Sequence, residues 1–255
     1  MTMAPKLELR GIVKRFGGKT VLNGLDLAVE AGRSLVVIGG SGQGKSVTLK
    51  VALGLMRPDR GKLFVDGKDV TAEAARGDPR HAARFGMLFQ GGALFDSLSV
   101  WENVAFRLIN ADGVPRKAAK ARALEALSMV RLGPESAELY PVELSGGMQK
   151  RVGLARAIVS TPEILFFDEP TTGLDPITGH VIDALIVEQV KRMGCTAVSI
   201  THDLASARRI ADEIAMIHDG RIVWRGPVGE LDSSGNPYME QFVGGRTEGP
   251  ITADV

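Results

Sequence analysis

The residues most suggestive of chemistry form a glycine-rich segment that ends in a lysine and a serine. Residues 39–46 fit the pattern G-x-x-x-x-G-K-[ST]. Glycines let backbone N–H groups converge on phosphate oxygens, and a following helix adds the positive end of its dipole. Lys45 supplies a point charge for the outer phosphates, and the Ser46 hydroxyl is a ligand for Mg²⁺. The segment, called the phosphate loop below, predicts a phosphate-binding site.

A pair of carboxylates supplies the second half of such a site. Asp168 and Glu169 follow the apolar run at residues 164–167. Asp168 can hold Mg²⁺ through water, and Glu169 can accept a proton from water that attacks a terminal phosphate. Alone, the pair would be interpreted as two solvated carboxylates that cap a strand. The phosphate loop favours the catalytic interpretation.

A second anion-binding helix start is predicted at residues 144–149, Leu-Ser-Gly-Gly-Met-Gln, ahead of a helix expected over 149–159. The sequence thus offers two phosphate cradles but only one Lys45 and one Glu169. Two chains facing each other head to tail would resolve this, because each would complete the site of the other.

These segments need buried strands to position them. Three short apolar runs predict such strands, and each run is followed by polar residues, at the edge where open parallel α/β sheets bind ligands. Two alternating segments joined at Gly17-Gly18 predict a small antiparallel sheet. The buried runs are residues 35–38, 164–167 and 197–200, the alternating segments are 7–13 and 21–29, and helices are expected over 47–53, over 115–132 and from Asp175-Pro176 onward.

Composition excludes several classes of protein. The chain has 255 residues with a formal net charge of +1, which argues against a nucleic-acid binder that works by bulk electrostatics. Cys195, the single cysteine, excludes an internal disulfide and fits a reducing compartment. The sequence has neither a run of roughly 18 apolar residues nor an apolar signal-peptide core at its start. Any link to a membrane is therefore expected through a partner, and residues from about Ser233 onward are expected to form an extended tail.

With these motifs, the chain resembles an ATP-binding cassette (ABC) ATPase over about residues 7–231. Ser145 follows Lys45 by 100 residues and precedes Glu169 by 24, the order and spacing of that family. The resemblance implies an α/β P-loop NTPase fold, in which an ABC ATPase core carries a small antiparallel β subdomain and a helical subdomain at about 91–160. A C-terminal tail at 232–255 would be a possible subunit contact. The matching motifs are Walker A at 39–46, the Q-loop at Gln90, the signature at 144–149, Walker B at 164–169, the D-loop at 173–175 and the switch histidine at His202.

The resemblance also implies a role for each matching residue. The activity would be ATP hydrolysis with Mg²⁺, catalysed by Glu169, His202 and Gln90, with Mg²⁺ held by Ser46, Gln90 and Asp168. Phe16 would stack on adenine where many members have Tyr, and Met148 replaces a common Gln of the signature. The full set implied to bind the nucleotide is Phe16, Gly39, Gly40, Ser41, Gly42, Gln43, Gly44, Lys45, Ser46, Val47, Ser145, Gly146 and Gly147.

A finer resemblance comes from the segment after Gln90. The string Gln-x-Gly-Ala-Leu-Phe at 90–95, Met148 and the tail at 241–251 are similar to the ATPase of Mla-type phospholipid transporters. That implies a peripheral subunit on the cytoplasmic face of a bacterial inner membrane. Its partners would be a second copy, integral permease subunits and an MCE-domain lipid-binding subunit, with no nucleic acid. The bulky residues Leu94, Phe95, Trp101 and Phe106 would be either helix-core packing or a groove for a helix of the membrane subunit.

Two other functions stay open on the sequence. One is the ATPase of an ABC importer for another small solute, such as an amino acid. The other is a soluble ABC protein of DNA repair or translation. The chain lacks the long coiled-coil insertion of the DNA-repair members, and it holds one cassette where translation members usually hold two.

Overall fold

The structure, a computed structural model, describes residues 4–252. The chain forms two compact units: the first comprises Met1–Asp78 with Val198–Val255, and the second comprises Pro79–Ala197. The predicted phosphate loop, Phe16 and His202 belong to the first unit. Gln90, the signature and the Asp168-Glu169 pair belong to the second. Within residues 4–252, no helix combines the length and the apolar character needed to cross a membrane.

The first unit contains the predicted antiparallel sheet. It comprises β1 (Leu7–Phe16), β2 (Lys19–Val29), β4 (Arg60–Val65) and β5 (Lys68–Asp69), in the order β2-β1-β4-β5. Leu7, Leu9 and Ile12 of β1 are buried. Gly17, in the turn to β2, has a φ of 56°, which glycine adopts without strain. The predicted hairpin is confirmed.

The first unit also contains parallel strands. β3 (Ser34–Ile38), buried over its whole length, pairs in parallel with β9 (Glu213–His218), and β10 (Arg221–Pro227) pairs antiparallel with β9. The phosphate loop leads from β3 into α1 (Lys45–Ala52), as predicted. β8 (Thr196–Ile200), also wholly buried, carries the boundary between the two units. The first unit also contains α2 (Thr71–Ala75) and α8 (Leu204–Ile210).

The expectation of an extended tail after Ser233 is wrong. The chain forms η3 (Val228–Ser233) and then α9 (Pro237–Gly244). The Asn236 side chain caps α9 by accepting hydrogen bonds from the backbone N–H groups of Tyr238 and Met239, at 3.1 and 3.2 Å. Met239 is fully buried. This polar, proline-containing segment is therefore helical because Asn236 caps the helix and the buried Met239 anchors it.

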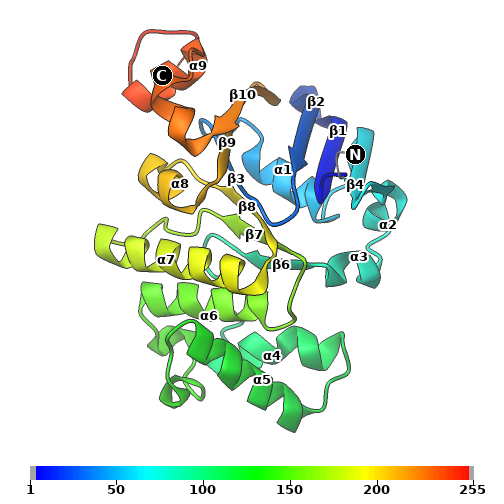
Figure 1. Cartoon of the computed structure of the whole chain (residues 1–255). Coiled ribbons are helices and arrows are strands. Elements are labelled where there is room, and N and C mark those ends of the chain that lie inside the picture. Colours follow the sequence, from blue (N-terminus) through cyan, green and yellow to red (C-terminus); the bar gives the residue numbers. More distant parts are fainter. Residues whose placement is uncertain (1–3, 253–255) are drawn as a thin grey trace. The chain divides into compact units, whose positions relative to one another are not determined.

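The second unit is mainly helical. Its strands β6 (Phe85–Leu88) and β7 (Ile164–Asp168) are parallel neighbours, with Leu88 opposite Phe167. Figure 1 shows α6 between α7 and the pair formed by α4 and α5. The helix predicted over 149–159 begins three residues earlier, at Gly146, because Ser145 caps it. The helices are α3 (Pro79–Ala83), α4 (Val100–Asn110), α5 (Arg116–Met129), α6 (Gly146–Ile158), α7 (Pro176–Met193) and the short η1 (Pro134–Ser136) and η2 (Pro141–Glu143).

Candidate functional site

The phosphate loop of the first unit curls around the ammonium group of Lys45. Lys45 Nζ donates hydrogen bonds to the carbonyl oxygens of Gly39 and Gly40, at 2.7 and 2.8 Å. Ser41, Gly42 and Ser46 are exposed, whereas Val47 is half-buried at the start of α1. The loop thus presents one cation and a polar, accessible backbone at a helix start, which suits an anionic phosphate chain.

Two glycines of this loop occupy positions where a side chain would not fit. Gly39 has a φ of 152°, and an added Cβ would lie 2.4 Å from the carbonyl oxygen of Ile217. Gly44 has a φ of 104°, and its Cβ would lie 2.7 Å from Leu22 Cδ2. The loop is therefore shaped against β9 and β2, and both contacts require glycine.

Gln43 ties the phosphate loop to the turn between β9 and β10. Its Oε1 accepts a hydrogen bond from the backbone N–H of Asp219, at 2.6 Å. Asp219 has a φ of 46°, an uncommon conformation for a residue other than glycine. The sequence pattern placed Gln43 in the loop but gave no signal for Asp219.

The two other predicted residues of the first unit are accessible. Phe16, at the end of β1, is 45% exposed, and the ammonium of Lys14 lies 5.5 Å from the centroid of its ring. Phe16 is therefore not a core aromatic. His202 is exposed directly after Thr201, whose N–H donates to the carbonyl oxygen of Val37 at 3.3 Å. His202 thus follows β8 at the edge where β3 enters the phosphate loop.

In the second unit, Gln90 and the acidic pair lie at one strand edge. Gln90 comes two residues after β6, and Asp168 ends the parallel neighbour β7. The ammonium of Lys150, on α6, donates hydrogen bonds to the carbonyl oxygens of Gln90 and, at 3.2 Å, of Glu169. The structure therefore brings Gln90 and Glu169 together through a residue that the sequence analysis missed.

Glu169 is held on both its backbone and its side chain. Its φ is 48°, in the left-handed region. Thr172 Oγ1 donates a hydrogen bond to Glu169 Oε2 at 3.0 Å, and the Thr172 N–H donates to the Glu169 carbonyl oxygen at 3.3 Å. Such a backbone costs about 1–3 kcal/mol and persists where the surroundings fix it, as is common at functional sites.

The signature residues form the start of α6. Ser145 is the N-cap, and its Oγ accepts a hydrogen bond from the N–H of Met148 at 3.3 Å. Ser145 and Gly146 are exposed, while Gly147 is buried, and an added Cβ there would lie 2.7 Å from Thr178 Cγ2 on α7. This helix start is open to an anion and tightly packed behind, as a phosphate cradle requires.

The comparisons with known proteins identify the family. A family model described as "ABC transporter" matches residues 22–172, more than half of the chain. The chain belongs to the ABC transporter family. It is an ABC ATPase: it has the mixed α/β P-loop fold with an antiparallel β subdomain, it binds ATP, and it hydrolyses ATP in support of transport.

Relatives of this ABC ATPase span several cargoes by name. "Probable ribonucleotide transport ATP-binding protein mkl" of Mycobacterium leprae is 38% identical over 98% of this chain and 72% of its own length. "Protein TRIGALACTOSYLDIACYLGLYCEROL 3, chloroplastic" of Arabidopsis thaliana is 38% identical over 96% and 75%. "Methionine import ATP-binding protein MetN" of Leifsonia xyli subsp. xyli is 41% identical over 95% and 72%.

A solved structure shares the architecture of this ABC ATPase. It is described as the dimeric structure of a post-hydrolysis state of an ATP-binding cassette bound to ADP and Pi. It is 30% identical, with a TM-score of 0.76, and the match covers 87% of this chain and 98% of that chain.

The bulky residues after the Q-loop divide into two groups. Trp101 is only 7% exposed and lies beneath the Arg116 guanidinium and the Lys120 ammonium, 4.9 and 5.1 Å from its ring centroid. Phe95 and Phe106 are exposed, with ring centroids 4.5 Å apart. Helix packing thus accounts for Trp101, while the two phenylalanines form an accessible aromatic pair.

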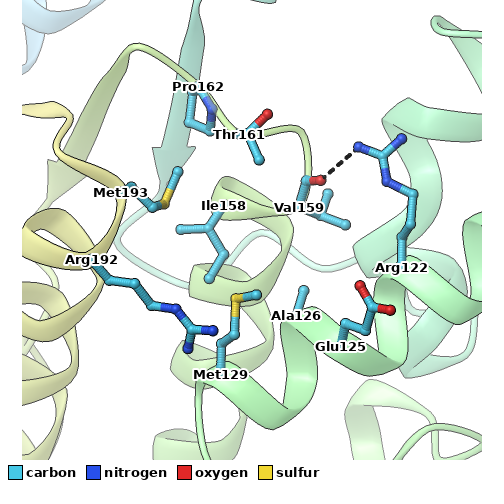
Figure 2. Close-up of a pocket in the computed structure, with 10 residues that line it drawn as sticks. All are labelled: Arg122, Glu125, Ala126, Met129, Ile158, Val159, Thr161, Pro162, Arg192 and Met193. Carbon is cyan, nitrogen blue, oxygen red and sulfur yellow. Dashed lines mark hydrogen bonds between the residues drawn. The ribbon is translucent and has the colours of Figure 1, made fainter.

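The ABC ATPase also has a cavity of about 370 Å³ in its second unit. Figure 2 shows the Arg122 guanidinium donating to the carbonyl oxygen of Val159, while Ile158 and Met129 contribute apolar surface. Its lining residues are Arg122, Glu125, Ala126, Met129, Ile158, Val159, Thr161, Pro162, Arg192 and Met193, and none belongs to the motifs of the sequence analysis.

Proposed function

We propose that this ABC ATPase works as a head-to-tail pair of identical subunits that drives phospholipid transport at a bacterial inner membrane. It would lie on the cytoplasmic face and act through permease and MCE-domain partners. The observation that carries the catalytic part is the placement of the Glu169 carboxylate, fixed by Thr172 at the same strand edge as Gln90.

The phosphate loop would hold the ATP phosphates. Its accessible backbone and the Lys45 ammonium neutralise the β- and γ-phosphate charge, and Phe16 offers an exposed ring for adenine. The Ser46 hydroxyl, the Asp168 carboxylate and the Gln90 amide are oxygen donors, the class of ligand that Mg²⁺ prefers, so these residues fit that ion. When bound, Mg²⁺ would neutralise charge on the phosphates.

Glu169 would act as the general base. Its carboxylate can accept a proton from the attacking water, and the bond from Thr172 restricts where the carboxylate points. His202, exposed and following the backbone beside β3, would donate a hydrogen bond to the γ-phosphate. Gln90 would report the state of the membrane partner to this site.

The signature would bind the γ-phosphate held by the second copy. Ser145 and Gly146 are exposed at the start of a 13-residue helix, so their N–H and hydroxyl groups can meet an anion from outside the chain. A solved cassette to which this chain is 30% identical is a dimer bound to ADP and Pi, which supports a pair of subunits.

The membrane partner would dock on the aromatic pair of Phe95 and Phe106. Both rings are exposed next to the Q-loop segment, and an apolar helix is the partner that such a surface recognises. Movement of Gln90 on nucleotide binding would then pass directly to the docked helix.

The phospholipid assignment rests on two observations. The Gln-x-Gly-Ala-Leu-Phe string resembles the Mla-type ATPases, and one relative carries a glycerolipid in its name. The second candidate is an importer for a small solute such as an amino acid, because the MetN relative is 41% identical over 95% of this chain. Purification with the membrane partners and mass spectrometry of bound molecules separates them: co-purified phospholipid supports the first, and an amino-acid-binding partner subunit without lipid overturns it.

The catalytic part is tested by two substitutions. Glu169→Gln should retain ATP binding and slow hydrolysis by about 10²-fold or more, because the base is lost while the cradle is intact. Lys45→Ala should instead weaken ATP binding itself. ATP affinity by fluorescence titration and turnover by phosphate release measure both effects. Near-normal turnover of Glu169→Gln would remove Glu169 as the base, and unchanged ATP affinity of Lys45→Ala would contradict the cradle.

A further inference from the structure

Lys150 is a buried lysine without a place in the motifs. Its exposure is 5%, although lysine is rarely buried unless its ammonium is paired. The ammonium donates hydrogen bonds to the carbonyl oxygens of Gln90 and Glu169, the latter at 3.2 Å. It therefore joins the backbones of two residues that the proposed function uses, from a third element, α6.

Burial and nearby charges both act on the Lys150 ammonium. Burial lowers the pKa of Lys150 below its usual value, and the negative charges of the neighbouring carboxylates, Asp168 and Glu169, partly oppose this shift. Bonds from a charged donor are roughly twice as strong as bonds between neutral groups. If the Gln90 and Glu169 carbonyl oxygens moved away, the buried ammonium would lose its hydrogen-bond partners. Because an unsatisfied buried charge is costly, the two carbonyl groups are held in place.

Glu169 needs such a restraint. Its φ of 48° is unfavourable for a residue with a side chain, and its carbonyl oxygen accepts from both Lys150 Nζ and the Thr172 N–H. The side chain of Glu169 projects from this fixed backbone. A change in the backbone therefore moves the carboxylate relative to the water it is to activate.

We propose that Lys150 is a positioning residue, which fixes the segment of Gln90 and the backbone of Glu169 as one unit and thereby places the catalytic carboxylate. This inference rests on the proposed role of Glu169 as the general base. Lys150 acts through Glu169 and need not touch the nucleotide. Loss of its bonds should lower the rate of hydrolysis more than the affinity for ATP.

The first test compares substitutions of Lys150 in the full chain. Lys150→Met keeps an unbranched aliphatic chain and removes the ammonium donors, and Lys150→Arg keeps a charged donor. Lys117→Met is the matched control on the exposed face of α5. Lys150→Met should lower kcat by about tenfold or more with KM for ATP within about threefold, since misplacement by about 1 Å can cost 10²-fold. Lys150→Arg should recover a third or more of kcat, and Lys117→Met should stay within twofold.

The second test asks whether Lys150 acts through Glu169. In a Glu169→Gln background, adding Lys150→Met should slow the residual rate by less than about twofold, because residues that act as a unit are not additive. Where Lys150→Met does not fold, Lys150→Gln, which is too short to join both carbonyl groups, takes its place in the same cycle.

Each outcome decides between the two proposals. An equal loss in both backgrounds, a normal kcat in Lys150→Met, or a loss shared by Lys150→Arg overturns the positioning role. A fully active Glu169→Gln variant instead overturns the proposed function, and it does so without reference to Lys150.

Discussion

At the scale of single residues, the phosphate loop has one cation at its centre and glycines packed against β9 and β2. The pattern predicted Lys45 and its glycines because each residue type there has a distinct physical use. It could not predict that Gly39 lies against the carbonyl oxygen of Ile217, because β9 is far away in the sequence. Lys150 was missed for a similar reason: a lysine within a helix is normally solvated, and only its burial shows otherwise.

The contact of Gly39 gives a prediction at this scale. In Gly39→Ala, the new Cβ would lie 2.4 Å from the Ile217 oxygen at a φ of 152°, so the loop must shift. We expect ATP affinity to fall by about tenfold or more and the free energy of unfolding to fall by about 2 kcal/mol. Isothermal titration calorimetry measures the affinity for ATP, and urea denaturation measures the free energy of unfolding. The control is Gly18→Ala, where a Cβ meets nothing within 4 Å; equal behaviour of the two variants would contradict the steric argument.

At the scale of elements, the start of α4 is set by a local capping box. The Ser99 N–H donates to Glu102 Oε2 at 3.0 Å, and Glu102 also pairs with Arg116 of α5. Four hydrogen bonds of the buried Asn103 hold the preceding turn, from Phe95 to Ser99. The aromatic pair is thus presented by a turn that α4 itself keeps in shape.

The capping box predicts a pH-dependent stability. The side-chain bond from Arg116 and the backbone bond from Ser99 lower the pKa of Glu102 below its usual value. The ionised Glu102 carboxylate therefore contributes fully to folding stability above the pKa of the unfolded chain, about 4.3. This contribution is lost as the pH falls through the lower pKa of Glu102 in the folded protein. Glu102→Gln should lower Tm at pH 7 by about 2–4 °C, for a cap worth about 1 kcal/mol, and by less at pH 3.

Thermal unfolding followed by circular dichroism checks this expectation. Glu125→Gln, at an exposed position on α5, is the control and should leave Tm unchanged at both pH values. If Glu102→Gln lowered Tm by the same amount at pH 3 and at pH 7, the charge of Glu102 would not be the cause of the loss.

Elements were predicted best where their signals are local. The hairpin at Gly17, the strand before Gly39 and the helix after Asp175 follow from alternation, burial runs and caps within a few residues. α9 was missed because its stability comes from Met239, whose burial depends on the folded unit. Trp101 was undecided between a groove and the core, and the cations of α5 placed above its ring explain its burial.

At the scale of the whole molecule, one chain carries two kinds of half-site. The phosphate loop with Lys45 and the exposed helix start at Ser145 are both suited to phosphate, and the sequence predicted both. The proposal of a head-to-tail pair follows, since a symmetric dimer then contains two equivalent sites, each with residues from both copies.

Mixing two defective variants tests this arrangement. Lys45→Ala and Ser145→Arg should each be nearly inactive alone. In a 1:1 mixture, half of the dimers would be mixed, and each mixed dimer would have one intact site, so about a quarter of wild-type activity should return. Phosphate release against protein concentration measures it, with each variant mixed with itself as the control. A mixture no more active than its components would contradict sites shared between copies.

One feature of α6 has a mechanical consequence. Six residues along α6 from Lys150, the guanidinium of Arg156 donates to the carbonyl oxygens of Gly92 and Ala93, at 2.6 and 2.7 Å. The helix that begins with the signature therefore holds the start of the connection between β6 and α4 at two points, Gln90 and the Gly92-Ala93 pair. One extra residue between Lys150 and Arg156 would rotate one contact relative to the other by about 100° around the helix axis, so such an insertion should break one of the two contacts and free part of the segment after Gln90.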